Sequence, residues 1–501
     1  MLTIKQLEHL SDMMDKSRLE IFLNTKDGNY LSNIKQSIDQ HVLPKNGLTQ
    51  PQREKYLSVL SYVESHLNGI TQRNQTDDGI DFIDTSQLKQ IATRDLIDTL
   101  GITIKKDEIN KLITFMTCLS AYTEDSQLNL SYNAPSSSGK SYIPVEIARL
   151  FPSEDIIEVG YCSPTAFFHS YGQFDKEKEG YIVDLSKKAL IFLDQPHQQL
   201  LEHLRPLLSH DKKEIVIKVT DKSQKFGLKT KNIYLLGYPA VIFCTAGLKI
   251  DEQEATRFLL LSPELTQEKI RESVLERINR DADKRRYNEQ LNMNGERLEL
   301  MTRIKAVRQA NISDVVIKNT DLINKMFFER VKKLKPKHQR DIGRLIGFTK
   351  LFALINLWFR ERDHDIIYAS DADIYEAFVI WDDISASQEL NLPPYIYNFF
   401  FEVIVEAYKD KNDELDEFGI GLQGLSKAEI QKKNYELTGR FLPDWQLRQQ
   451  IFIMLETAGL IRMGPDPNDK RRVLVYPNID IDQKYSELNG GVNDSGGDDD
   501  D

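Results

Sequence analysis

Six short apolar runs between residues 128 and 245 constrain the fold of this chain most strongly. Each run has the length of a β-strand and is bounded by polar residues, and amphipathic stretches lie between several of them, at 142–151 and 198–208. Strands that alternate with helices form a parallel sheet, so the pattern predicts an α/β fold. The runs are LNLSYN (128–133), DIIEVG (155–160), KALIFLD (188–194), EIVIKV (214–219), NIYLLG (232–237) and AVIFCT (240–245).

The composition is typical of a cytoplasmic protein, and we expect no membrane contact. The three cysteines are scattered and form no CxxC pair, which argues against a disulfide framework or a zinc cluster. No run of about 18 apolar residues is present, and the N-terminus lacks the apolar segment of a secretory signal. The net charge of −12 excludes a uniformly basic coat for nucleic acid and leaves room for local basic elements.

Changes in pattern along the chain divide it into five segments. The last of them is rich in glycine and aspartate and has almost no apolar content, which predicts disorder. The predicted segments are a helical N-terminal domain (1–115), an α/β core (116–264) with a lysine-rich hairpin (211–237), a helical lid (265–388), a C-terminal unit (389–482) and an acidic tail (483–501).

The stretch NAPSSSGKS (133–141) has the pattern of a phosphate-binding loop between a strand and a helix. Gly139 would let the backbone approach phosphates, Lys140 would neutralise the β- and γ-phosphates of ATP, and Ser141 would bind Mg²⁺. Ala134 occupies the place of the usual first glycine, which is tolerable if its φ is negative. A chance match is the alternative, so a second acidic element is needed. The predicted ATP-binding residues are Ser136, Ser137, Ser138, Gly139, Lys140 and Ser141.

The second element is Asp194, which ends the apolar run KALIFLD. In P-loop ATPases an aspartate at the end of a buried strand holds Mg²⁺. Gln195 follows where such enzymes usually have glutamate. An amide can orient water but cannot accept its proton, so either hydrolysis is slow or another group assists. His197 could assist, and a solvated or structural histidine is the alternative interpretation.

Further segments make the core similar to AAA+ ATPases and, within that class, to the minichromosome maintenance (MCM) helicases. GYCSPTAF resembles the segment before the family's helix-2 insert, and HQRDIGRLIGF resembles its sensor-2 helix. AVIFCTAG resembles the sensor-1 strand, and EATRFLLLSPE resembles the segment that carries the arginine finger. The segments span 160–167, 338–348, 240–247 and 254–264.

The resemblance implies roles for several polar residues. Thr245 is the available polar group where the family has a sensor-1 asparagine near Ala246. Arg257 would reach the γ-phosphate bound by a neighbouring subunit, and a salt-bridged surface arginine is the alternative. Arg340 would be the sensor-2 arginine, with Arg344 one turn later as its substitute.

The lysine-rich hairpin resembles the family's pore hairpin, which touches DNA phosphates. We predict two strands, 214–220 and 231–237, around a turn at 225–227. Lysines on such a hairpin would add affinity without reading sequence, whereas the alternative is an ordinary solvated hairpin. The predicted DNA-contacting residues here are Lys218, Lys222, Lys225, Phe226 and Lys229.

The C-terminal unit has the order helix, helix, basic hairpin, which is the winged-helix pattern. Lys470, Arg471 and Arg472 lie near the turn of the hairpin and would contact DNA. Many winged helices make only protein contacts, and that alternative stays open.

The sequence therefore predicts an α/β protein with a P-loop AAA+ core, a helical lid, a helical N-terminal domain and a C-terminal winged helix. By resemblance, its function would be ATP- and Mg²⁺-dependent DNA translocation or unwinding by a ring-shaped homo-oligomer, with a hexamer expected, in replication or mobile-element maintenance. Gln195 favours an alternative, a slowly hydrolysing ATP switch or loader on DNA, such as an initiator or transposition regulator. A protein remodeller is a weaker third reading.

Overall fold

The computed structural model describes residues 83–160, 162–221, 229–245, 257–331, 333–417, 423–467 and 469–478. The chain divides into two units, Met1–Asp84 and Thr85–Asp501, and nearly all described residues belong to the second. Helices α5 (Thr93–Leu100) and α6 (Glu108–Ser120) lie in this second unit, so the expected boundary at residue 115 falls inside α6.

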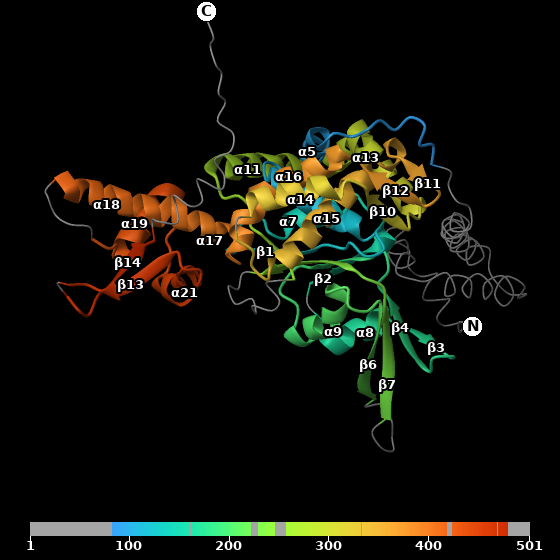
Figure 1. The fold of residues 1–501 in the computed structure, drawn as a ribbon, viewed down its shortest axis with the longest axis horizontal. Coiled ribbons are helices and arrows are strands. Elements are labelled where there is room, and N and C mark those ends of the chain that lie inside the picture. Colours follow the sequence, from blue (N-terminus) through green and yellow to red (C-terminus); the bar gives the residue numbers. More distant parts are fainter. Residues whose placement is uncertain are drawn as a thin grey trace, which may run out of the picture. The chain divides into compact units, whose positions relative to one another are not determined.

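A five-stranded parallel sheet forms the centre of the core, which confirms the predicted α/β fold class (Figure 1). The strand order is β2-β5-β8-β1-β9, and every neighbouring pair is parallel. Strands β1, β5 and β8 are buried along their whole length. The sequence of β5 is continuously apolar, as is typical of a strand covered on both faces, whereas β1 buries the polar residues Asn129, Ser131 and Asn133. The strands are β1 (Asn129–Asn133), β2 (Ile156–Val159), β5 (Ala189–Phe192), β8 (Ala240–Thr245) and β9 (Leu259–Leu261).

The outer backbone groups of the edge strand β9 are hydrogen-bonded to one side chain. Gln388 of α16 (Asp371–Glu389) donates from Nε2 to the carbonyl of Leu260 at 2.7 Å and accepts from the Leu260 N–H at 3.1 Å. The amide thus occupies the hydrogen-bonding positions that a further strand would use, so this edge is not free to pair with another chain.

A second sheet of four strands joins the predicted insert to the lysine-rich hairpin. Its order is β3-β4-β7-β6, with β4 parallel to β7 and β6 antiparallel to β7. Its apolar face packs against α8 (Pro164–Tyr171) and α9 (Gln198–Leu208), and the hairpin reaches past both helices (Figure 1). The strands are β3 (Gln173–Asp175), β4 (Gly180–Asp184), β6 (Glu214–Asp221) and β7 (Lys229–Leu236).

The turn after β7 requires glycine. Gly237 has φ +80°, and a Cβ there would lie 2.2 Å from Ser186 Oγ. Any other side chain would be strained and would push the end of β7 away from the segment after β4.

Residues 265–388 are mainly helical, as the sequence predicts, with a small sheet of order β10-β12-β11 that the sequence does not predict. The apolar run 345–359 is largely the buried part of α15. The elements are α11 (Gln267–Ala282), α12 (Lys284–Met293), α13 (Gly295–Gln309), β10 (Asp314–Ile317), α14 (Thr320–Arg330), α15 (His338–Ile355), β11 (Arg362–Asp363) and β12 (Ile366–Ala369), followed by α16.

The C-terminal residues have a hydrophobic core of their own. Two helical segments, α19 and α20–α21, precede the antiparallel pair β13–β14, and Leu425 bridges to Val475. The assignment as a winged helix stays a prediction. The elements are α17 (Pro394–Phe399), a π-helix (Phe400–Val405), α18 (Glu406–Glu417), α19 (Lys427–Thr438), α20 (Asp444–Gln446), a π-helix (Leu447–Ile451), α21 (Phe452–Thr457), β13 (Ile461–Pro465) and β14 (Val473–Pro477). Among the described helices, none is both long and apolar enough to cross a bilayer.

Candidate nucleotide-binding site

The loop after β1 has the backbone of an anion-binding turn. Ser137 and Gly139 have positive φ values of +64° and +86° on either side of Ser138, and such alternation points successive N–H groups into one concavity. A Cβ on Gly139 would meet no atom within 4 Å, so glycine is needed here for its backbone conformation. The loop leads directly into α7 (Tyr142–Ala148).

The missing first glycine has a structural explanation. Ala134 is buried, its φ is not positive, and its N–H donates to the carbonyl of Thr245 at 3.4 Å. The residue therefore extends the pairing of β1 with β8 by one position, and a small L-residue suits it. Ala134 is tolerable in place of glycine if its φ is negative, and its φ is indeed not positive.

The loop contains one buried hydroxyl, the Oγ of Ser138, that has no hydrogen-bond partner among the described residues. A buried hydroxyl without a partner costs free energy, and a phosphate oxygen in the concavity would remove that cost. The residues present thus fit a phosphate group, with Lys140 as the nearby cation.

Polar groups from three strands meet at the carboxyl end of the sheet. Thr245, the last residue of β8, is paired in register with Asn133, the last residue of β1. Its hydroxyl donates to Oε1 of Gln195 at 3.1 Å, and the Gln195 N–H donates to Asp194 Oδ1 at 2.8 Å. The structure thus places Asp194, Gln195 and Thr245 together beside the loop.

Cys244 lies next to the loop and within electrostatic range of both Lys140 and Asp194. Its thiol donates to the Lys140 carbonyl at 3.4 Å. Burial raises the pKa of the Cys244 thiol to about 12, while the charge of Lys140 opposes this rise and that of Asp194 adds to it. Both charges are therefore within electrostatic reach of a single buried sulfur. Sequence reasoning missed Cys244, because a free cysteine in a buried strand resembles any apolar residue.

His197 has a structural task. Its Nδ1 accepts from the Gln199 N–H at 3.2 Å, which makes it the N-cap of α9. This contact supports the structural interpretation and leaves Gln195 as the residue beside Asp194 that faces Thr245.

Arg257 lies at the other end of the sheet. Leu259 pairs with Leu130, so the register places Arg257 level with Leu128, before β1 begins. Its Nε donates to Ser209 Oγ at 2.9 Å, at the end of α9. The loop starts after Asn133, and five strand residues at about 3.3 Å each separate the two levels by about 16 Å. The arginine therefore cannot reach the loop of its own chain.

Arg344 of α15 lies with Arg257 rather than with the loop. Arg344 donates from Nη2 to the carbonyl of Phe258 at 3.0 Å and from Nη1 to Asp341 at 3.2 Å. Burial lowers the pKa of the Arg344 guanidinium, against the effect of Asp341, and the charge of the exposed Arg340 lowers it further. Arg344 is thus a half-buried link between α15 and the segment before β9, and Arg340, one turn earlier on α15, is exposed.

The predicted DNA contacts are described in part. Lys222, Lys225 and Phe226 lie outside the described residues. Lys218 is exposed on β6 opposite Asn232, and Lys229 begins β7 opposite Asp221.

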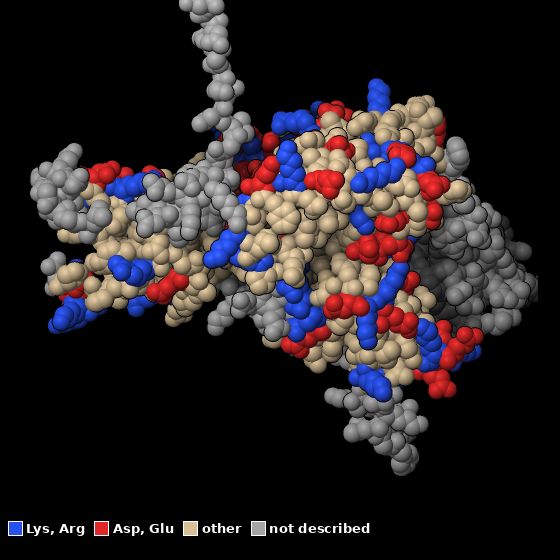
Figure 2. Space-filling model, viewed as in Figure 1, with Lys and Arg blue, Asp and Glu red and all other residues tan. Residues whose placement is uncertain are grey.

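The base of the hairpin carries ion pairs rather than a uniform positive charge. Lys213 pairs with Glu124, and Lys178 pairs with Glu214 at 2.8 Å. Figure 2 shows basic and acidic side chains interspersed on the visible face of the chain.

The basic residues of the C-terminal hairpin are exposed at its turn. Lys470 and Arg471 precede β14, and Arg472 pairs with Asp469 at 3.5 Å. Among the described residues, Lys470 forms no ion pair, so its ammonium group can bind a phosphate without breaking one.

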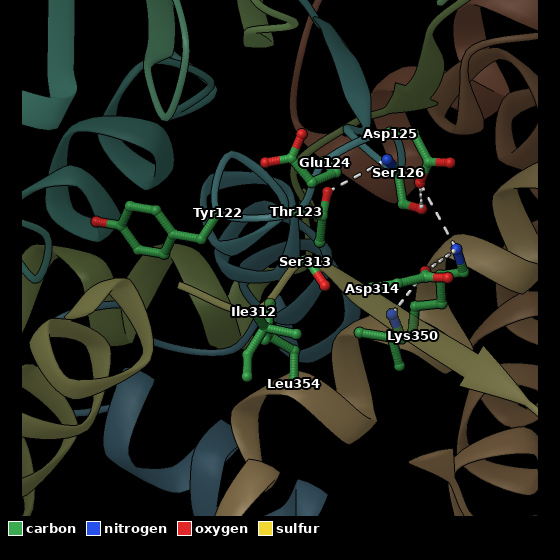
Figure 3. Close-up of a pocket in the computed structure, with 11 residues that line it drawn as sticks. Tyr122, Thr123, Glu124, Asp125, Ser126, Ile312, Ser313, Asp314, Lys350 and Leu354 are labelled. Atoms are coloured by element: carbon green, nitrogen blue, oxygen red, sulfur yellow. Dashed lines mark hydrogen bonds and ion pairs between the residues drawn. The ribbon is translucent and has the colours of Figure 1, made fainter. Parts of the chain in front are cut away.

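A small hollow apart from the loop is lined by none of the predicted site residues (Figure 3). Lys350 of α15 spans it, 3.6 Å from Asp125 and 3.3 Å from Asp314. These ion pairs fix α15 to the turn before β1 and to β10. The hollow is therefore a joint between the helical segment and the core.

Neither a protein-family model nor a curated protein matches the sequence. Solved structures with a similar arrangement include a candidate ATPase from Cytophaga hutchinsonii, at 14% identity over 57% of this chain and 84% of that chain, with a TM-score of 0.29. An MCM homolog from Methanopyrus kandleri is 14% identical over 58% of this chain and 59% of that chain, with a TM-score of 0.35. The helicase Cch of SCCmec type IV is 10% identical over 80% and 72%, with a TM-score of 0.29. The proposed function therefore rests on the geometry of the site.

Proposed function

We propose that this chain is an oligomeric, Mg²⁺-dependent ATPase that acts on DNA as a translocase or helicase. The observation that carries the proposal is the cluster of Asp194, Gln195 and Thr245 at the carboxyl end of the sheet. Beside it lies a loop that contains Lys140 and a buried Ser138 hydroxyl without a hydrogen-bond partner among the described residues. This combination of a phosphate cradle, a cation, a carboxylate and water-orienting groups is what ATP hydrolysis requires.

The roles follow from the atoms. Lys140 and the loop N–H groups would bind the phosphates, and Ser141 and Asp194 would hold Mg²⁺, which neutralises phosphate charge when bound. Gln195, held by Thr245, would orient water. Arg257 lies at the opposite end of the sheet and cannot reach this loop. A second copy would supply Arg257, which makes hydrolysis depend on assembly.

The test is ATP turnover with and without single- and double-stranded DNA. Turnover that DNA stimulates and that Lys140→Ala abolishes supports the proposal. Lys305→Ala, on the exposed side of α13, is the matched control and should retain wild-type turnover. Turnover that neither DNA form stimulates, together with an inert Lys140→Ala substitution, would contradict the proposal.

A second candidate function is a slow ATP switch or loader on DNA. Gln195 favours it, because an amide cannot accept the proton of the attacking water and its Oε1 already accepts from Thr245. Gln195→Glu should then raise turnover by at least ten-fold, with nucleotide affinity little changed. Unchanged turnover would remove the basis of the switch. An assembly on DNA that forms with ATP and turns over too slowly for unwinding would favour it over the motor.

A further inference from the structure

The turn of the C-terminal hairpin presents three consecutive cations to solvent. Backbone hydrogen bonds fix its shape, because the Arg472 N–H donates to the Asp469 carbonyl at 2.8 Å and the Asp466 N–H donates to the Arg472 carbonyl at 2.9 Å. The Arg472 side chain stays 73% exposed although its Nε lies 3.5 Å from Asp469. We call the three exposed cations the basic turn, and they are Lys470, Arg471 and Arg472.

The hairpin that carries the basic turn has an excess of positive charge. Residues 461–477 hold four cations and two carboxylates, in a chain whose net charge is −12. One of these carboxylates, Asp469, already serves the turn itself, since its Oδ1 accepts from the Arg471 N–H at 3.1 Å. Among the described residues, Lys470 forms no ion pair. The basic turn can therefore bind a polyanion without giving up an existing contact of Lys470.

The residues that follow the hairpin are strongly acidic. Residues 479–501 hold eight carboxylates and one lysine, a net charge of −7. Four of the carboxylates are consecutive, at Asp498, Asp499, Asp500 and Asp501. We call residues 479–501 the acidic segment, and it lies outside the described residues. Its charge is opposite to that of the basic turn and larger.

The acidic segment begins within reach of the basic turn. Asn478 is held in place, because its N–H donates to the Leu460 carbonyl at 2.9 Å and its Nδ2 donates to the Gly459 carbonyl at 2.6 Å. Six residue steps separate Arg472 from Asn478, at most about 20 Å at 3.3 Å per residue. Twenty steps separate Asn478 from Asp498, and a chain of that length spans up to about 66 Å. The four aspartates can therefore reach the basic turn of their own copy.

We propose that the acidic segment binds the basic turn of the same copy and shields it from DNA. This inference rests on the proposed function, because DNA phosphates are what the basic turn would otherwise bind. A tether of this length holds the carboxylates near the turn at an effective concentration on the order of 1 mM. An acidic partner in solution has no such advantage, which identifies the chain's own segment as the occupant. DNA then gains the turn only by competing with the segment.

Crosslinking with a carbodiimide, which joins a carboxylate to an amine in contact with it, tests the contact without DNA. In the full chain at low salt, mass spectrometry should find residues 498–501 joined to Lys470. The yield should not change on about ten-fold dilution, because the contact lies within one copy. Lys284 is the matched control, since Lys284, Arg285 and Arg286 repeat the sequence of the basic turn and are also exposed.

Three results of the crosslinking would overturn the proposal. They are the absence of a crosslink to Lys470, crosslinks to Lys284 as frequent as those to Lys470, and a yield that falls on dilution. The last result would place the acidic segment on another copy.

A DNA-binding measurement tests the shielding. Replacing all four residues 498–501 by Asn should tighten DNA binding about five-fold or more at low salt in fluorescence anisotropy, and the gain should shrink as salt rises. In a chain that also carries Lys470→Ala, Arg471→Ala and Arg472→Ala, the same replacement should change Kd by less than about two-fold. With residues 284–286 replaced by Ala instead, the gain should remain.

The outcomes separate the shielding from the proposed function. An equal gain with and without the basic turn would mean that the acidic segment repels DNA from the whole chain, and it would overturn the docking. A crosslink to Lys470 without any gain in DNA affinity would keep the contact and contradict the role of the basic turn in binding DNA.

Discussion

Copies that carry Lys140→Ala and copies that carry Arg257→Ala should together hydrolyse ATP, although neither variant does so alone. The reason is the separation of the two residues within one chain. Arg257 is level with Leu128, and the loop begins after Asn133, about 16 Å further along the sheet at about 3.3 Å per residue. Each copy can therefore contribute its loop to one shared site and its Arg257 to another, but it cannot supply both groups to the same site.

The size of the recovery follows from counting neighbours. A site works when its loop comes from the Arg257→Ala copy and its arginine from the Lys140→Ala copy. In an equal random mixture each condition holds for about half of the positions, so about a quarter of the wild-type turnover should return if every contact is head to tail.

The assay is steady-state phosphate release at constant total protein while the ratio of the two variants is changed. Turnover should rise from near zero, reach its maximum at equal amounts and fall again. A mixture that is never more active than the sum of its separate components would refute the reasoning, as would an Arg257→Ala protein with wild-type turnover.

Three further predictions concern stability and DNA. Burial lowers the pKa of Lys337 to about 8, so between pH 8 and its usual 10.5 the unfolded chain binds more protons and folding stability rises with pH. Lys337→Met should remove about 2 kcal/mol of this pH dependence, measured by urea unfolding at pH 7.5 and 10. Asp155→Asn should cost about 2 kcal/mol in the same assay, because it removes the buried carboxylate that pairs with the half-buried Arg308 and leaves only the exposed Glu154 as its partner. Lys218→Ala should weaken DNA binding equally across sequences and lower the slope of log Kd against log salt by about one, measured by fluorescence anisotropy.

The central sheet could be predicted because its strands are buried on both faces. Leu190 and Ile191 in β5 and Val241 and Ile242 in β8 form unbroken apolar runs that no helix period explains. The loop could be predicted because its residue types follow from backbone chemistry. Strand β9 was missed, since three leucines in a row are as common in a helix as in a strand.

Other features depend on contacts between distant residues. Arg344 was expected only as a substitute for Arg340, and its bond to Phe258 joins segments 86 positions apart. The exposure of Ile270 and Val274 on α11 could not be predicted either, because helical spacing shows that they share a side but not which side the core covers. Sequence spacing reports neighbours along an element, and tertiary packing decides the rest.

The sheet that joins the insert to the hairpin has a mechanical consequence. Strand β7 is hydrogen-bonded on both edges, to β6 on one side and to β4 on the other, so the hairpin does not pivot on a single turn. Its two strands have eight residues each, about 26 Å at 3.3 Å per residue. A pull along the hairpin loads both ladders in shear, and their hydrogen bonds resist together rather than one after another. Strand β4 (Gly180–Asp184) therefore stiffens the hairpin. How far the hairpin bends under load depends on the pairing of β4 with β7 as much as on the pairing of β6 with β7.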